Sequence, residues 1–174
     1  MIKLADRALF IGRFQPFHHG HLAVVESLLA KHQEVIIAIG SAECCSADDN
    51  PFSAGERVEI IRASLLPEQL MRVIIIPVRD INNNSLWVSH LKSYVPEFSV
   101  VYTNNKLVSM LFLKAGIKVD GISYVDRGLN EGKVIRKLMS MGDDKWKKHV
   151  PCGAHKFILS INGIERMKAI SERE

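Results

Sequence analysis

The sequence predicts an α/β protein built on a doubly wound parallel sheet of about five strands, with helices on both faces and a helical C-terminal segment. Its 174 residues can bury one substantial core but fall short of the roughly 250 residues of a complete (β/α)8 barrel. Short apolar runs alternate with amphipathic helical patterns, as in successive βαβ units. We therefore expect one domain over residues 1–174, with a helical segment from about residue 131 packed on it.

The composition is that of a globular protein with a small positive excess. Hydrophobic residues make up 47% and charged residues 24%, which excludes a disordered chain. The 23 Lys and Arg against 19 Asp and Glu give a net charge of +4. An excess of this size favours a small anionic partner over a nucleic-acid-coating surface, and aromatic residues are not interleaved with the basic ones.

The sequence also indicates the cellular compartment. No apolar run approaches the length of about 18 residues that spans a bilayer, and charged residues at 3, 6 and 7 interrupt the place of a signal peptide. We expect a cytoplasmic protein with no membrane partner. The three cysteines, Cys44, Cys45 and Cys152, match neither a disulfide framework nor a zinc spacing, so reduced thiols are the simplest interpretation.

Five apolar runs are the expected strands. The first four are rich in β-branched and aromatic residues, and the fifth is the weakest. They cover residues 8–11, 35–39, 73–77, 99–102 and 121–124.

Helical spacing of apolar residues fills the intervals between these runs. The expected crossover helices cover residues 22–30, 56–66, 86–94 and 107–115. From about residue 134 onward the pattern is helical and rich in Lys and Arg. Such a run is most simply a solvated helix face, with an anion site as the alternative.

The first predicted strand leads directly into the turn GRFQPFHHGH, which spans residues 12–21 and opens a helix. In a parallel sheet this turn lies at the carboxyl edge, where the helix presents free N–H groups to anions. Gly12 permits close backbone approach. His18 and His21 are three residues apart, so both imidazoles can donate to one anion. The motif predicts a phosphate site, whereas isolated histidines would more often be structural.

Further segments carry a family resemblance over nearly the whole chain. They include IGSA at 39–42, NPFSAGER at 50–57, PVRDINNNSLWVSH at 77–90, TNN at 103–105 and INGIERMK at 161–168. With the HxGH motif, the sequence resembles the HxGH nucleotidyltransferases, in particular the archaeal-type nicotinamide mononucleotide (NMN) adenylyltransferases. The resemblance implies a Rossmann-like fold, synthesis of NAD and pyrophosphate from NMN and ATP with Mg²⁺ held mainly by substrate phosphates, and a homo-oligomer, typically a hexamer.

The same resemblance implies a set of site residues. His18, His21 and Arg136 would be catalytic. The residues implied for ATP binding are Gly12, Arg13, Phe14, His18, His21, Asn105, Gly132, Lys133 and Arg136. Those implied for NMN binding are Ser41, Asp80, Asn84 and Trp87, with the Trp87 indole suited to stacking on a cationic pyridinium.

Two further segments offer both a functional and a structural interpretation. Asn104 and Asn105 follow the fourth strand, where their amides could serve the nucleotide or form a turn. Arg57 lies inside a helical pattern beside Glu56, which favours a structural salt bridge over a phosphate contact.

The sequence departs from the family at the second phosphate motif. Glu131-Gly132-Lys133 stands where the family has Ser-Gly-Thr, so both hydroxyls are missing. Lys133 offers three donors and a full charge in their place. Two alternatives to the NMN enzyme therefore stay open, namely a nucleotide-binding protein with lost or reduced catalysis and a transferase that uses another phosphorylated acceptor.

Overall fold

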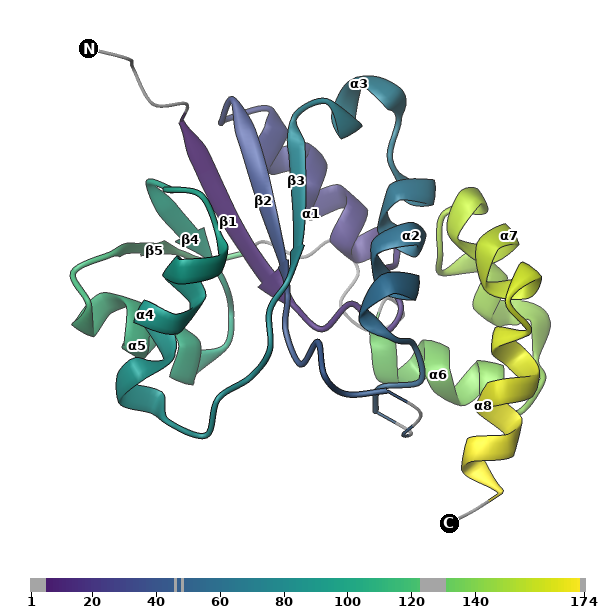
Figure 1. Ribbon diagram of the computed structural model, residues 1–174. Helices are drawn as coiled ribbons and strands as arrows, with labels where there is room; N and C mark the ends of the chain where they lie inside the picture. The colour runs from purple at the N-terminus through teal and green to yellow at the C-terminus, as the bar shows by residue number, and fades with distance from the viewer. Residues whose placement is uncertain (1–5, 46, 48, 123–130, 173–174) are drawn as a thin grey trace.

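The fold is a five-stranded, all-parallel sheet with helices around it (Figure 1). The computed structural model describes residues 6–45, 47, 49–122 and 131–172. The strand order is β3-β2-β1-β4-β5, so the chain reverses its direction of winding between β1 and β4. The strands are β1 (Arg7–Gly12), β2 (Glu34–Ile39), β3 (Val73–Pro77), β4 (Val100–Tyr102) and β5 (Lys118–Asp120).

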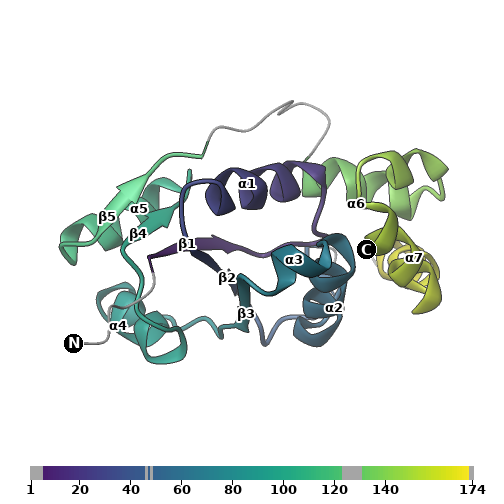
Figure 2. The same ribbon diagram turned by 90° about the horizontal axis from the view of Figure 1, so that it is seen from above.

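Two helical layers enclose this sheet, as the view in Figure 2 shows. Helix α1 (His19–Leu29) lies on one face, and α4 (Asn84–Tyr94) and α5 (Lys106–Lys114) lie on the other. Alternate residues of β1 face the two layers: Ala8 and Phe10 join the core under α1, while Leu9 joins the core under α4 and α5. The predicted doubly wound fold is confirmed.

The C-terminal third forms a helical group beside α2 (Ala54–Ser64). It comprises α6 (Gly132–Ser140), the 3-10 turn η1 (Asp144–Lys148), α7 (Cys152–Ser160) and α8 (Gly163–Ser171). Helix α7 packs directly on α2, and α6 packs on α8. The backbone N–H of His19 donates to the carbonyl of His149 over 3.0 Å. This bond attaches the C-terminal group to the start of α1.

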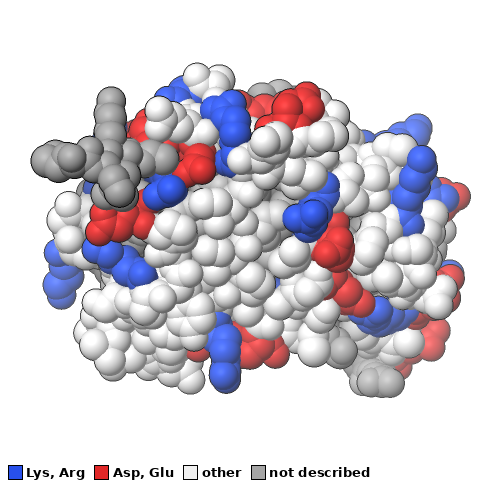
Figure 3. Space-filling view, turned by 45° about the horizontal axis from the view of Figure 1, so that its top comes forward, with Lys and Arg blue, Asp and Glu red and all other residues white. Residues whose placement is uncertain are grey.

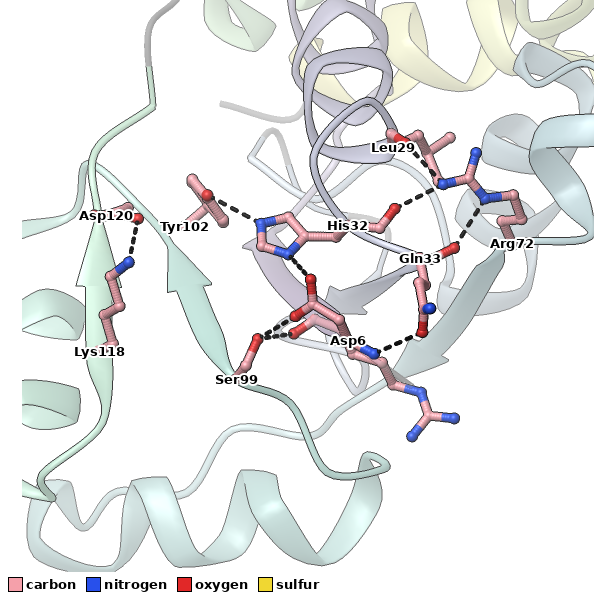
Figure 4. A network of polar contacts seen from close by, with 10 residues as sticks. Asp6, Leu29, His32, Gln33, Arg72, Ser99, Tyr102, Lys118 and Asp120 are labelled. Atoms are coloured by element: carbon pink, nitrogen blue, oxygen red, sulfur yellow. Dashed lines mark hydrogen bonds and ion pairs between the residues drawn. The ribbon is translucent and has the colours of Figure 1, made fainter. Parts of the chain in front are cut away.

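A polar network fixes the other end of α1 (Figure 4). The His32 ring lies between the Asp6 carboxylate, at 2.9 Å from Nδ1, and the Tyr102 hydroxyl, at 3.1 Å from Nε2. Bonds from Ser99 and His32 lower the pKa of Asp6, and burial raises the pKa of Tyr102. The Arg72 guanidinium donates to the carbonyl of Leu29, the last residue of α1, and to the carbonyls of His32 and Gln33 just after it. Helix α1 is thus attached to the C-terminal group at its start, and its end is attached to β4 and to the segment before β3.

The structure moves one strand and adds one helix to the expected set. The fifth strand is Lys118–Asp120 and not 121–124; Ser123 and Tyr124 lie outside the described residues. Its charged ends hid it from a search for apolar runs, although charges are common on edge strands. The four-residue helix α3 (Pro67–Leu70) is too short to show helical periodicity.

Charged groups are mixed on the surface seen in Figure 3. On that face Lys and Arg side chains lie among Asp and Glu side chains, so the positive excess is not gathered there into one basic surface. Within the part of the chain that is described, no helix combines the length and apolarity needed to cross a bilayer.

Two glycines on the packed helices differ sharply in their surroundings. A methyl group at Gly153 in α7 would overlap the Ala63 carbonyl in α2, so the close approach of these helices requires glycine there. At Gly55 nothing lies within 4 Å of the place that a Cβ atom would take, so no close contact requires glycine there.

We predict that Gly153→Ala lowers the free energy of unfolding by about 3 kcal/mol, because the methyl group forces α7 away from α2. Gly55→Ala is the matched control and should change stability by about 1 kcal/mol or less, in the stabilising direction. Urea unfolding followed by circular dichroism measures both. Equal effects of the two substitutions would contradict this packing.

Candidate functional site

The loop between β1 and α1 is built around the ring of Phe14. Phe14 has a positive φ of 52° and is 2% exposed. A Cβ atom at Gly12 would lie 2.9 Å from this ring, so Gly12 provides the space into which the ring folds. Phe14 meets the His21 ring edge-on, with centroids 4.9 Å apart. The resemblance implied that Phe14 lines the ATP site; the structure places its ring in the core, where it supports His21.

His18 and His21 form a stacked pair at the N-terminus of α1. Their ring centroids are 3.6 Å apart and their planes differ by 22°. His18 caps the helix, because its Nδ1 accepts the backbone N–H of His21 over 3.3 Å. An accepting Nδ1 carries no proton, which puts the ring proton on Nε2. In His21, Nδ1 is buried and has no hydrogen-bond partner among the described residues.

Both imidazoles are neutral near pH 7. Burial lowers the pKa of His18 to about 4, with smaller contributions from His19 and His149. Burial, and then the neighbouring His18, lowers the pKa of His21 well below its usual value. The pair therefore offers N–H donors without positive charge. An anion bound beside the rings would reverse part of this shift.

Helix α6 meets this loop directly. Gln15 pairs its side-chain amide with the backbone of Phe52, which fixes the carbonyl of Gln15. That carbonyl accepts a hydrogen bond of 2.9 Å from Nη1 of Arg136. A Cβ atom at Gly132 would lie 3.2 Å from the same oxygen. The structure thus brings Gly132 and Arg136 to the histidine loop, as the sequence suggested.

A carboxylate also occupies this junction. Oδ1 of Asp49 accepts a hydrogen bond of 3.1 Å from Nη2 of Arg136, and Oδ2 of Asp49 lies 3.8 Å from Nη1 of Arg13. Lys133 and Lys137 lie on the same face of α6 as Arg136, and all three line a 240 Å³ pocket together with Asp49. Lys133 is exposed, so its ammonium can reach an anion in this pocket without leaving solvent.

Arg57 joins the two loops that border the site. Its fully buried guanidinium donates to the carbonyls of Arg13, Gly40, Ser41 and Ser53, over distances between 2.8 and 3.3 Å. Burial lowers its pKa. The structural role expected for Arg57 is confirmed, but its partners are carbonyls; Glu56 instead pairs with Arg166 over 2.7 Å.

Ser41 and Asp80, from the implied NMN set, lie together beyond β2 and β3. The Ser41 hydroxyl donates to the Asp80 carboxylate over 2.6 Å, and Ser41 has a positive φ of 49°. The backbone N–H of Asp80 donates to the Glu43 carboxylate over 3.1 Å. This end of the site is therefore acidic and suits hydroxyl or cationic groups.

Asn84 and Trp87 lie one turn apart at the start of α4. Asn83, which precedes them, caps the helix by accepting the N–H groups of Ser85 and Leu86. The Trp87 ring is partly buried and meets Phe112 edge-on, with centroids 5.7 Å apart. Its orientation is thereby fixed, while part of the side chain stays exposed.

The two asparagines after β4 serve the backbone. Asn104 exchanges two hydrogen bonds with Ile122, at 2.8 and 2.9 Å. The side-chain oxygen of Asn105 caps α5 by accepting the N–H of Val108. These contacts favour the turn-forming interpretation of residues 103–105 over the nucleotide-binding one. A nucleotide contact from Asn105 would have to use the N–H groups of its side-chain amide.

Sequence reasoning missed several residues at the site, Asp49, Gln15 and Glu43 among them. Gln15 lies inside a recognised motif, and Glu43 and Asp49 each directly adjoin one, so their positions were a usable signal. The partners of Asp49 could not be predicted, because Arg13 and Arg136 are distant in sequence. The described residues contain no group of three or more metal-ligating side chains.

The helix cap gives a pH prediction. His18 titrates near 6.5 when unfolded and at about 4 when folded, so its contribution to stability is complete above pH 6.5 and is lost as the pH falls towards 4. His18→Asn keeps a capping acceptor without this titration. Between pH 7.5 and 5 the variant should lose about 2 kcal/mol less unfolding free energy than the wild type.

Urea unfolding at both pH values measures this difference. His19→Asn is the control, because His19 is exposed and contributes less than burial to the lowered pKa of His18, so this variant should retain most of the wild-type pH dependence. Parallel pH profiles for His18→Asn and the wild type would contradict a buried neutral His18.

Comparison with known proteins assigns the chain to a family. The cytidylyltransferase-like family model matches residues 9–148. A nicotinamide-nucleotide adenylyltransferase from Archaeoglobus fulgidus is 47% identical over 97% of this chain and 99% of its own length. The enzyme of the same name from Ignicoccus hospitalis is 46% identical, with the same two coverages.

A solved structure supports the fold. A bifunctional NMN adenylyltransferase/ADP ribose pyrophosphatase from Francisella tularensis, complexed with AMP and a manganese ion, superposes with a TM-score of 0.81 at 23% identity. The match covers 96% of this chain and about half, 52%, of that longer protein. At this identity the likeness concerns the fold. On the strength of the near full-length relatives, the chain belongs to the nicotinamide-nucleotide adenylyltransferases, a family of nucleotidyltransferase enzymes.

Proposed function

We propose that the protein joins ATP and NMN into NAD, releasing pyrophosphate. The observation that carries this proposal is the stacked pair of neutral histidines at the start of α1, with Arg136 of α6 bonded to the same loop. Helix N-termini and fixed N–H donors bind phosphate, and the family's enzymes are named for this transfer.

The reaction needs an in-line displacement at the ATP α-phosphorus. An oxygen of the NMN 5′-phosphate attacks this phosphorus, a new P–O bond forms, and the bond to the β-phosphate oxygen breaks. Pyrophosphate leaves with the electron pair of that bond. No covalent enzyme intermediate is required, and the contribution of the protein is to position the reactants and stabilise charge.

His18, His21 and Arg136 stabilise the charge that builds on the equatorial oxygens. Donors that are held rigid before the reaction favour the transition state over the ground state. Stacking and helix capping hold the two rings, and the Gln15 carbonyl holds the guanidinium.

The remaining ATP contacts come from the rim. Arg13 and Lys133 attract the β- and γ-phosphates, while Gly12 and Gly132 shape the backbone beside them by leaving room for the Phe14 ring and the Gln15 carbonyl. Lys133 takes the place of the family's hydroxyl group with an ammonium. Asn105, whose side-chain oxygen caps α5, would contact ATP through its amide N–H groups.

NMN occupies the edge beyond β2 and β3. The exposed part of Trp87 stacks on the cationic nicotinamide ring. Asn84 bonds its carboxamide or ribose, and the Ser41–Asp80 pair accepts ribose hydroxyls. The acidic character of this edge favours the pyridinium as well.

A divalent metal, which we take to be Mg²⁺, accompanies the triphosphate. The donor set fits a metal held mainly by substrate phosphates, because no group of three metal-ligating side chains is found among the described residues. When bound, the metal neutralises charge on the triphosphate and on the leaving pyrophosphate.

Two other functions would use the same fold. A binding protein would keep both nucleotide sites without turnover because Glu131-Gly132-Lys133 lacks the hydroxyls. A transferase for another phosphorylated acceptor would need a different partner for Trp87 and Asn84. A single domain, cytoplasmic location and homo-oligomeric assembly, with a hexamer typical of the family, remain predictions.

The direct test supplies the purified protein with ATP, NMN and Mg²⁺ and follows NAD and pyrophosphate by chromatography. We expect both products in equal amounts. His21→Ala should lower kcat by about a hundredfold while changing the KM for NMN little, because a lost transition-state donor acts on turnover.

His19→Ala is the matched control, since this exposed neighbour belongs to neither substrate site, and it should retain wild-type kcat. Binding of both nucleotides by calorimetry without any NAD formation would establish the binding protein instead. NAD formation from ATP with a better acceptor than NMN would identify the other transferase.

A further inference from the structure

Asp49 lies between Arg13 and Arg136, the two arginines that the proposed function assigns to the ATP phosphates. One carboxylate oxygen accepts a hydrogen bond from Arg136 over 3.1 Å, and the other lies 3.8 Å from the Arg13 guanidinium. A carboxylate and a phosphate use the same geometry towards guanidinium groups. Both anions cannot hold the same donors at once.

Burial shows which partner can move. The Arg136 side chain is 12% exposed and bonds the Gln15 carbonyl through Nη1, so its guanidinium is held on the loop side. Asp49 is 69% exposed and reaches the pair from the segment between β2 and α2. Its carboxylate can turn into solvent at little cost, and Nη2 of Arg136 can then donate to an incoming anion in its place.

The charge around Asp49 supports this exchange. Lys133, Arg136 and Lys137 line the adjoining 240 Å³ pocket, and Arg13 stands on the other side of the carboxylate. Without Asp49 these cations would repel one another and attract any polyanion. With Asp49 present, an incoming triphosphate must displace one negative charge and then bind close to it.

We propose that Asp49 is a displaceable counter-ion, which orients Arg13 and Arg136 in the nucleotide-free protein and weakens the binding of the triphosphate that replaces it. The proposal rests on the proposed function only in taking the triphosphate to be that of ATP. In this role Asp49 positions the two arginines and lowers the affinity for ATP. Its carboxylate is not assigned to the metal.

Asp49→Asn tests the proposal, with ATP binding measured by calorimetry in EDTA and again with Mg²⁺. The variant should bind metal-free ATP about three- to tenfold more tightly, because exposed ion pairs of this kind are individually weak. Asp49→Glu should behave as the wild type. Asp144→Asn, which removes an exposed carboxylate from its pair with Lys147, should change nothing.

A double substitution separates this role from a general charge effect. In an Arg136→Gln background, Asp49→Asn should tighten ATP binding by less than about twofold, since half of the competed site is gone. An equal gain in both backgrounds would overturn the proposal. Unchanged or weaker metal-free binding by Asp49→Asn would also overturn it, and a loss confined to Mg²⁺-loaded ATP would make Asp49 a metal ligand.

These outcomes are independent of turnover. If the wild type forms no NAD but Asp49→Asn binds ATP more tightly, the proposed function fails and the counter-ion role stands. If NAD forms but ATP affinity does not rise in the variant, the counter-ion role fails alone. Circular dichroism melting of each variant, together with Asp49→Ser as a second uncharged variant, confirms that folded protein is compared.

Discussion

The site depends on the buried guanidinium of Arg57. Its donors bond carbonyls from the loop after β1 and from the loop after β2, which lie side by side in the sheet. A buried charge is costly unless its hydrogen bonds are satisfied, and here four carbonyls satisfy it. The same cation therefore fixes the backbone that carries Arg13 and the backbone that leads from Ser41 towards Asp49. Among the described residues of the two loops there is no β-ladder, and the loop after β2 has an isolated bridge between Ala47 and Asn50.

Around Arg57 the structure separates the neutral histidine hydrogen-bond donors from the exposed charged side chains. His18 is buried and His21 is partly buried, both rings are uncharged, and their positions are set by stacking, by Phe14 and by the cap of α1. The charged groups stand at the rim, where Asp49 balances two arginines in the absence of nucleotide. A site arranged in this way keeps its rigid part prepared for the transition state and lets ion pairs exchange as substrates enter and leave.

Local patterns predicted the parts of the molecule that depend on local interactions. The alternation of apolar runs predicted β1 to β4 and the crossover helices, since burial on two faces selects those residues. The HxGH turn predicted a site at the start of α1, and Gly132 and Arg136 did meet it. The partners of Asp49 were not predictable, because they are 36 and 87 residues away in sequence. Arg57 was correctly predicted to be structural. The predicted partner was a neighbouring carboxylate, whereas the observed partners are backbone carbonyls that include those of two loops.

The most direct test of this account is the activity of Arg57→Lys, with loop order read by hydrogen exchange. A lysine keeps the charge but cannot reach carbonyls in both directions, so both loops should exchange faster and kcat/KM for NAD formation should fall by about a hundredfold. The sheet strands should keep their protection. Wild-type activity in a folded Arg57→Lys protein would contradict the claim that this guanidinium builds the site.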